Sequence, residues 1–196
     1  MGLREFFGLG RAALNEPRGD FAPGIDFVDL AAAVPEMTVE ELWHSQPHLR
    51  TVTSFIARMV ATVSLHVYER QEDGGRARVR DTYLAELVRR PNPYETLYQL
   101  IYGSVLDLCL YDEFVWVLDD SPRRGDRFHL YRIPQEWIVG RKWRNNWELS
   151  HLGIRDDSPA GRVWVPGDRV VQLAGYSPHS VRSGDSPINA LRTVLK

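Results

Sequence analysis

The sequence predicts an α+β fold in which amphipathic helices pack on a small, mostly antiparallel sheet. Apolar residues recur at helical spacing through the first part of the chain, to about residue 110. The later part consists of short runs rich in β-branched and aromatic residues, separated by Asp, Gly, Pro or Ser. The last residues are typical of the start of a longer helix. The chain has 196 residues, of which 43% are hydrophobic and 26% charged, as in ordinary globular proteins.

The first predicted helix begins at a capping box. Thr38 is followed three residues later by Glu41, so the hydroxyl and the carboxylate can each accept a hydrogen bond from an N–H at the helix start. Pro47 then interrupts or restarts the helix. Residues 1–37 hold short apolar pieces and prolines without a sustained period, and we expect a flexible N-terminal arm there.

The helix after Pro47 is predicted to bury one face. Large apolar side chains fall on that face at helical spacing, which is typical of a helix packed on a core. They are Val52, Phe55, Ile56, Met59, Val60 and Val63. The segment "SLHVYER" (64–70) then alternates in polarity and predicts a strand, which leads to a turn at residues 73–75.

Two further helices are predicted around a proline-rich junction. "DTYLAELVRR" (81–90) is stopped by Pro91, because the proline ring disfavours helical geometry in the residue before it. Asn92 can then cap a new helix, with Pro93 as its first residue and Glu95 as its third. That helix is expected to run to about Leu110. Its apolar face consists of Tyr94, Leu97, Tyr98, Ile101, Val105 and Leu108.

Strands dominate the remainder. Residues 113–118, 127–133, 147–154 and 169–173 predict short strands with a spacing that suits an antiparallel sheet. We therefore expect an α+β domain over residues 38–176. Residues 177–196 are expected to form a loop and the start of a helix, with Ser186 as its N-cap and Pro187 as its first residue. That helix has no C-terminal stop signal, so we expect the natural protein to continue beyond Lys196.

Charge and cysteine content exclude several classes of protein. The formal net charge of −2 argues against a globally basic nucleic-acid binder. The single cysteine, Cys109, cannot form an internal disulfide, which indicates a reducing compartment; it is predicted to be a buried structural residue. No apolar run approaches the roughly 20 residues of a membrane span. The opening "MGLREFFGLGRAAL" lacks the apolar region of a signal peptide.

Nothing in the sequence predicts a catalytic, cofactor or metal site. His44 and His48 are four residues apart, but Pro47 lies between them and no further ligand follows at a suitable spacing. No Gly-x-Ser-x-Gly turn is present. The acidic pairs at 119–120 and 156–157 fall in turn-like contexts, where Asp is favoured for its local hydrogen bonds.

One segment, "GRKWRNNWEL", interleaves cations with indoles. Such residues can bind a phosphate backbone and stack on bases, which makes the segment a candidate for contact with DNA or another partner. The alternative, which we favour from the sequence, is a solvated hairpin tip whose tryptophans fold onto the sheet. The candidate residues are Arg141, Lys142, Trp143, Arg144 and Trp147.

The order of these elements resembles the HK97-like family of tailed-phage portal proteins. A helix followed by "ATVSLHVYER", a Gly-containing turn and "LAELVRRPNPYETLYQLIYGSVLDLCLYDEFVWVL" is similar to the family's arrangement. "LYRIPQEWIVG", "VPGDRVVQLAGYSP" and "SGDSPINALRTVL" resemble its later pieces, so the likeness spans roughly residues 45–196. The chain departs from the family at residues 111–113, where a glycine is usual, and at residues 184–187, which keep the Ser-Pro cap but lose an apolar residue.

The resemblance implies a portal wing, truncated before the stem and clip, with no catalysis and no cofactor. Portal subunits form a ring, usually a homododecamer, at one capsid vertex of the virion. DNA is packaged and ejected through that ring, which also connects head to tail. The implied partners are other copies of the chain, the major capsid protein and double-stranded DNA in transit. A head–tail adaptor and terminase would bind through regions that this chain lacks. Assembly would take place in the host cytoplasm, without a membrane.

Two other hypotheses remain open at this point. The chain could be a nucleic-acid-binding module that uses residues 141–147, or a small hydrolase whose site the sequence does not reveal. If the natural protein ends at Lys196, a degenerate prophage remnant that forms no ring becomes a further alternative.

Overall fold

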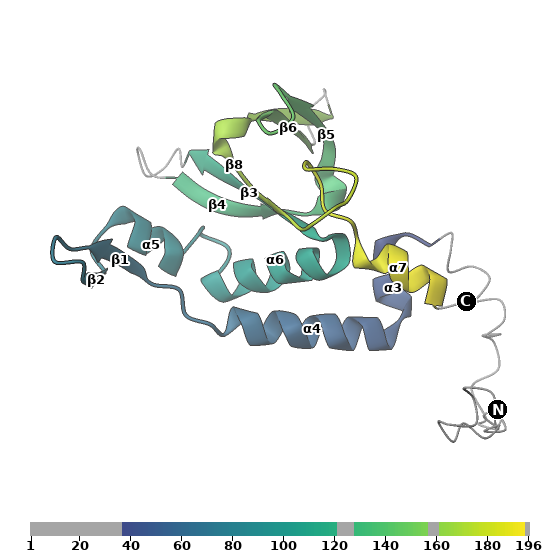
Figure 1. Ribbon diagram of the computed structural model, residues 1–196, viewed down its shortest axis with the longest axis horizontal. Helices are drawn as coiled ribbons and strands as arrows, with labels where there is room; N and C mark the ends of the chain where they lie inside the picture. The colour runs from purple at the N-terminus through teal and green to yellow at the C-terminus, as the bar shows by residue number, and fades with distance from the viewer. Residues whose placement is uncertain (1–36, 121–127, 157–160, 195–196) are drawn as a thin grey trace, which may run out of the picture.

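The computed structural model describes residues 37–120, 128–156 and 161–194. Its helices and sheets are stacked in layers, with α6 between α4 and a three-stranded sheet (Figure 1). The helices are α3 (Val39–Ser45), α4 (Pro47–Ala61), α5 (Tyr83–Arg89), α6 (Leu97–Tyr111) and α7 (Pro187–Val194). Two short 3₁₀ helices are η1 (Gln135–Trp137) and η2 (Gly167–Arg169). Most of the N-terminal arm predicted over residues 1–37 lies outside the described residues.

All the strand pairings are antiparallel. One sheet has the order β4-β3-β8, a second has the order β5-β6-β7, and β1 and β2 form a separate hairpin. The strands are β1 (Val67–Arg70), β2 (Arg76–Val79), β3 (Glu113–Asp120), β4 (Phe128–Ile133), β5 (Ile138–Trp143), β6 (Leu149–Arg155), β7 (Arg162–Pro166) and β8 (Val170–Ala174).

The α+β prediction with antiparallel strands is confirmed, although the single sheet that was expected is divided. Three strands were missed: β2, β5 and β7. The sequence "RARV" of β2 alternates in charge rather than in hydrophobicity, and β5 contains a glycine and two cations. Strand β7 is short and ends at a proline. None of these strands carries the apolar alternation by which strands are identified in a sequence.

The capping box at the start of α3 forms as predicted. The Glu41 amide donates to the Thr38 hydroxyl at 3.2 Å, and the Thr38 amide donates to the Glu41 carboxylate at 2.7 Å. Pro47 is the first residue of α4, so the proline restarts the helix rather than merely interrupting it.

The predicted start of α6 at Pro93 is wrong. Asn92 is buried, and its side-chain oxygen accepts hydrogen bonds from the amides of Tyr94 and Glu95 at 2.9 and 2.8 Å. Its amide nitrogen donates to the Leu130 carbonyl of β4, also at 2.9 Å. The junction is therefore a side-chain-closed turn fixed to the sheet.

Helix α6 begins four residues later, at Leu97. Thr96 and Gln99 form a second capping box there, which replaces the predicted Asn92 cap. This shift also changes the buried face of the helix. Tyr94 is exposed outside the helix, whereas the buried positions of α6 are Leu100, Ser104, Asp107 and Leu110.

Two apolar clusters hold the layers together. The larger lies between the two three-stranded sheets and contains Val115, Val117, Ile133 and Leu152. The smaller consists of Leu42, Leu110 and Ile188, so it joins α3, α6 and α7 at one end of the molecule. Helix α7 is thereby packed on the rest of the fold, in agreement with the predicted start at Pro187.

The predicted burial of the apolar face of α4 is wrong. The buried residues of α4 are Thr53, Ala57 and Ala61, on the side that packs against α6 and α3. Small side chains allow neighbouring helix backbones to approach closely, so the small face packs inward. The large side chains of the predicted stripe, from Val52 to Val63, are exposed.

Candidate interaction surfaces

The predicted contact residues 141–147 lie at the end of β5 and in the turn that leads to β6. Successive side chains of a strand point to opposite faces, so Arg141 and Lys142 are separated by the sheet. Arg141 forms an ion pair with Glu113 of β3, and both side chains are largely buried. Lys142 lies on the other face, with its Nζ 4.1 Å from the ring centroid of Trp164. The structure therefore does not bring these two cations together.

The turn between β5 and β6 is closed by Asn145. Its side-chain oxygen accepts hydrogen bonds from the amides of Trp147 and Glu148, both at 2.8 Å. Arg144 forms an ion pair with Glu148 at 2.6 Å. Trp147 projects from this turn with 78% of its surface exposed. The predicted alternative is therefore only partly realised, because this indole does not fold onto the sheet.

Trp143 is covered by a residue from the C-terminal part of the chain. The guanidinium carbon of Arg182 lies 5.2 Å from the ring centroid of Trp143. Arg182 also donates to the side-chain oxygen of Asn146 at 2.7 Å. Beside these residues is an open hollow of about 570 Å³, lined in part by Trp143, Trp147, Leu173 and Val181. The exposed feature of this region is an indole beside an apolar hollow.

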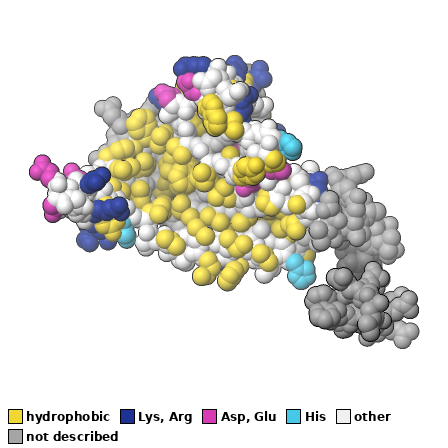
Figure 2. Space-filling view, in the orientation of Figure 1, with side chains coloured by type: hydrophobic (Ala, Val, Ile, Leu, Met, Phe, Trp, Pro, Cys, Tyr) yellow, Lys and Arg dark blue, Asp and Glu magenta, His cyan; other side chains and the backbone are white. Residues whose placement is uncertain are grey.

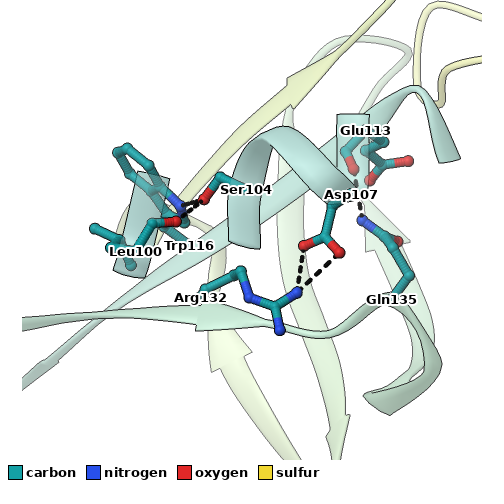
Figure 3. A network of polar contacts seen from close by, with 7 residues as sticks. All are labelled: Leu100, Ser104, Asp107, Glu113, Trp116, Arg132 and Gln135. Carbon is teal, nitrogen blue, oxygen red and sulfur yellow. Dashed lines mark hydrogen bonds and ion pairs between the residues drawn. The ribbon is translucent and has the colours of Figure 1, made fainter. Parts of the chain in front are cut away.

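A network of buried polar contacts fixes α6 to the β4–β3–β8 sheet (Figure 3). The indole nitrogen of Trp116 donates to the Ser104 hydroxyl at 2.7 Å, and that hydroxyl donates to the Leu100 carbonyl at 2.7 Å. One turn further along α6, Asp107 binds Arg132 of β4. Burial raises the pKa of Asp107 to about 6, and the attraction of Arg132 only partly opposes that rise.

The turn from α6 into β3 forms a corner at residues 111–113. Asp112 adopts the left-handed conformation, with φ of 58°. Asp tolerates this conformation better than most residues, so it serves here in place of the glycine that is usual in the family that the sequence resembles. Glu113 is buried, and desolvation raises its pKa although Arg141 acts in the opposite direction.

The C-terminal segment binds to this corner. The Gly175 amide donates to the Asp112 carbonyl at 2.8 Å, and the Asp185 amide donates to the Asp112 carboxylate at 3.2 Å. A Cβ atom on Gly184 would lie 2.1 Å from the Asp112 carbonyl oxygen, so only glycine fits there. The Ser186 hydroxyl, which was predicted to cap α7, instead donates to the Leu110 carbonyl and accepts from the Ile188 amide.

A second candidate surface lies along α4, and the sequence did not predict it. We call it the α4 stripe: the exposed large apolar side chains of α4 and of the segment that follows it. They are Val52, Phe55, Ile56, Met59, Val60, Val63 and Leu65. Figure 2 shows hydrophobic side chains gathered over α4, α6 and the sheet above, with most charged side chains toward the margins of that face. The small residues at positions 53, 57 and 61 were the signal that could have revealed which side packs inward.

Residues with reactive or metal-binding side chains do not gather into a site. Within the described ranges, no group of three or more His, Cys, Asp or Glu residues is placed to hold a metal ion. His44 lies 3.7 Å from Glu40, one turn earlier in α3. Cys109 is half-buried in α6, and its burial raises the thiol pKa. Among the described helices, none combines the length and hydropathy that a membrane crossing requires.

Comparison with known proteins identifies relatives. The sequence model of the phage portal protein family matches residues 47–196. No curated protein matches the chain.

Several solved structures share the fold. The neck of an empty GTA particle computed with C6 symmetry is similar with a TM-score of 0.60 and 14% identity, over 83% of this chain and 42% of the other. The neck of a native GTA particle computed with C12 symmetry gives 0.58 and 12%, over 80% and 41%. An HK97-family phage portal protein from Corynebacterium diphtheriae gives 0.51 and 15%, over 81% and 45%. The chain thus spans about two fifths of the length of these relatives.

Proposed function

Because this chain belongs to the phage portal protein family, we propose that it is a structural subunit of the ring at a capsid vertex. DNA would be packaged and ejected through that ring, which would also connect head to tail. The observation that carries the proposal is the shared fold with the necks of particles computed with cyclic symmetry. We propose that the chain serves this role without catalysis or a cofactor.

The proposed partners follow from the same role. Other copies of the chain would form the ring, a homododecamer as in the neck computed with C12 symmetry. The major capsid protein would surround the ring, and double-stranded DNA would pass through it. A head–tail adaptor and terminase would bind through parts of the subunit outside residues 1–196. The ring would be assembled in the host cytoplasm and carried in the virion at the portal vertex.

The charge balance suits a passage for DNA. Strong binding of phosphates by many cations would oppose sliding, because each neutralised phosphate adds to affinity. The net charge of −2 avoids that effect. Arg141, Lys142 and Arg144 each have an intramolecular partner, so they present little unpaired positive charge.

Within this role we propose that residues 141–147 contact a protein partner rather than grip DNA. Trp147 is the residue that supports this proposal, since it combines high exposure with a position beside an apolar hollow. Aromatic side chains of this kind are frequent anchors of protein interfaces.

The proposal is tested by the assembly state of the natural full-length protein. Negative-stain electron microscopy and mass photometry should show closed rings of about a dozen subunits, as closed cyclic symmetry requires. A monodisperse monomer that binds DNA tightly, with affinity falling steeply as salt rises, would overturn it in favour of a nucleic-acid-binding module. Turnover of a substrate abolished by a single His or Asp substitution would favour a hydrolase instead.

A further inference from the structure

We propose that the α4 stripe is the surface through which one copy of this chain packs against the next copy in the ring. This inference rests on the proposed function, because it names the part of the subunit that would build the proposed ring. It depends on the orientation of α4, on the absence of charge within the stripe and on the geometry of cyclic assemblies.

The stripe is too large to be incidental. Its seven side chains are each between 41% and 64% exposed, with Phe55 at the upper end. At 100° per residue, those on α4 cover an arc of roughly 140° around the helix axis. The largest apolar patch of a typical monomer covers about 300–600 Å² and is often functional. A continuous row of half-exposed Val, Ile, Leu, Met and Phe side chains belongs to that class.

The described fold does not need the stripe, because α4 is held by its other side. Thr53, Ala57 and Ala61 are buried there. The indole nitrogen of Trp43 also donates to the Thr53 hydroxyl at 3.2 Å and ties α4 to α3. Helix α4 therefore presents its small residues to its own subunit and its large apolar residues outward. This is the arrangement of a helix between two layers, one of which is a separate surface.

The chemistry of the stripe selects an apolar protein surface as its occupant. None of its members is charged, and the cations of α4 lie elsewhere on the helix, at Arg50 and Arg58. Binding of DNA requires cations at the contact, which the stripe lacks.

The apolar surface also continues onto the sheet. Val171 and Leu173 of β8 are 42% and 51% exposed. They pair with Trp116 and Phe114 of β3, so they lie on the sheet face whose Trp116 bonds to α6. Strand β8 is an edge of its sheet. A partner that covers the α4 side of the molecule would thus find further apolar surface at this edge.

Cyclic symmetry determines how a second copy must sit. In a ring of more than two subunits, each interface joins one patch to a different patch on the neighbour. The stripe of one copy would therefore pack on a different surface of the next copy. Packing of two stripes on each other would close a dimer and exclude larger rings.

A matched pair of substitutions tests this inference in the natural full-length protein. Phe55→Asp places a charge in the stripe, whereas Thr51→Asp places the same charge one turn earlier, on an exposed polar position of the same helix. We expect Thr51→Asp to assemble like the wild type. We expect Phe55→Asp to lower the fraction of ring at least tenfold in mass photometry, with an unchanged circular dichroism spectrum.

A second measurement avoids the risk that Phe55→Asp fails to fold. A photo-crosslinking amino acid at position 55 should join neighbouring subunits within assembled rings, whereas the same group at position 51 should give no such product. Rings that form equally well with Phe55→Asp, or an absence of intersubunit crosslinks from position 55, would overturn the inference and leave the proposed function intact. A wild-type protein that forms no rings would overturn the proposed function itself.

Discussion

Arg132 holds both carboxylate oxygens of Asp107 with a single guanidinium nitrogen, Nη1, at 2.8 and 2.7 Å. The contact joins β4 to α6 across 25 residues of sequence. Because the Asp107 side chain is only 8% exposed, the ion pair is formed at the cost of removing a carboxylate from water. Its contribution to stability therefore depends on pH.

The first prediction concerns that pH dependence. Burial raises the pKa of Asp107 from 3.8 to about 6. Between those values the unfolded chain loses its proton while the folded chain keeps it, so the stability contributed by this group falls as pH rises. It is complete below about pH 4 and lost above about pH 6, and the change is on the order of 3 kcal/mol at 1.36 kcal/mol per pKa unit.

Denaturant unfolding of the wild type and of Asp107→Asn at several pH values between 4 and 7 isolates this contribution. The difference between the two proteins should change across that range and become constant above it. Parallel stability curves for the two proteins would show that Asp107 titrates normally.

The second prediction concerns the hydroxyl between Trp116 and Leu100. Ser104→Ala leaves the Trp116 indole N–H without its acceptor in a buried position. The loss should lower the free energy of unfolding by about 1–2 kcal/mol. Urea unfolding measures it, with Ser64→Ala as an exposed control expected to stay within about 0.5 kcal/mol of the wild type. Equal effects of the two substitutions would contradict the prediction.

The third prediction tests the conformation of Asp112. Replacement by Ala removes the acceptor of the Asp185 amide and keeps a Cβ in the left-handed conformation. Replacement by Gly removes the same acceptor but relieves the steric cost of about 1–2 kcal/mol. Asp112→Gly should therefore be more stable than Asp112→Ala by about 1 kcal/mol in chemical unfolding. The reverse order would show that the Asp112 backbone is not left-handed in solution.

The fourth prediction separates the roles of two residues within 141–147. Arg141→Ala leaves the buried Glu113 carboxylate without its cation, which should destabilise the fold by about 3 kcal/mol or more. Trp147→Ala removes an exposed side chain and should change stability by less than about 0.5 kcal/mol. Thermal and denaturant unfolding measure both. A strongly destabilised Trp147→Ala protein would show that its indole packs on the fold.

Sequence reasoning succeeded where the determinants are local. The Thr38–Glu41 capping box spans one helical turn, and its geometry follows from residue types alone. The same reasoning misplaced the start of α6, because Asn92 and Thr96 are both good caps four residues apart. What decides between them is the hydrogen bond from Asn92 to Leu130, which is 38 residues away in sequence.

The candidate surfaces required the structure for a different reason. A helical pattern shows that α4 has one apolar side, but burial depends on which side the neighbouring layers take. The ion pair of Arg141 with Glu113 likewise joins two strands that are not adjacent in sequence, so "GRKWRNNWEL" has the pattern of a basic cluster although its first cation is a core residue.

The corner at residues 111–113 has a mechanical consequence. Gly175, Asp185 and Ser186 all bind within Leu110–Asp112, and Ile188 packs beside Leu110. Helix α7 therefore leaves the fold from a clamped joint rather than from a loose tether. A torque applied along α7 would be transmitted directly to α6, and through the contacts of Asp107 and Ser104 to the sheet, so the described fold would turn as one rigid lever.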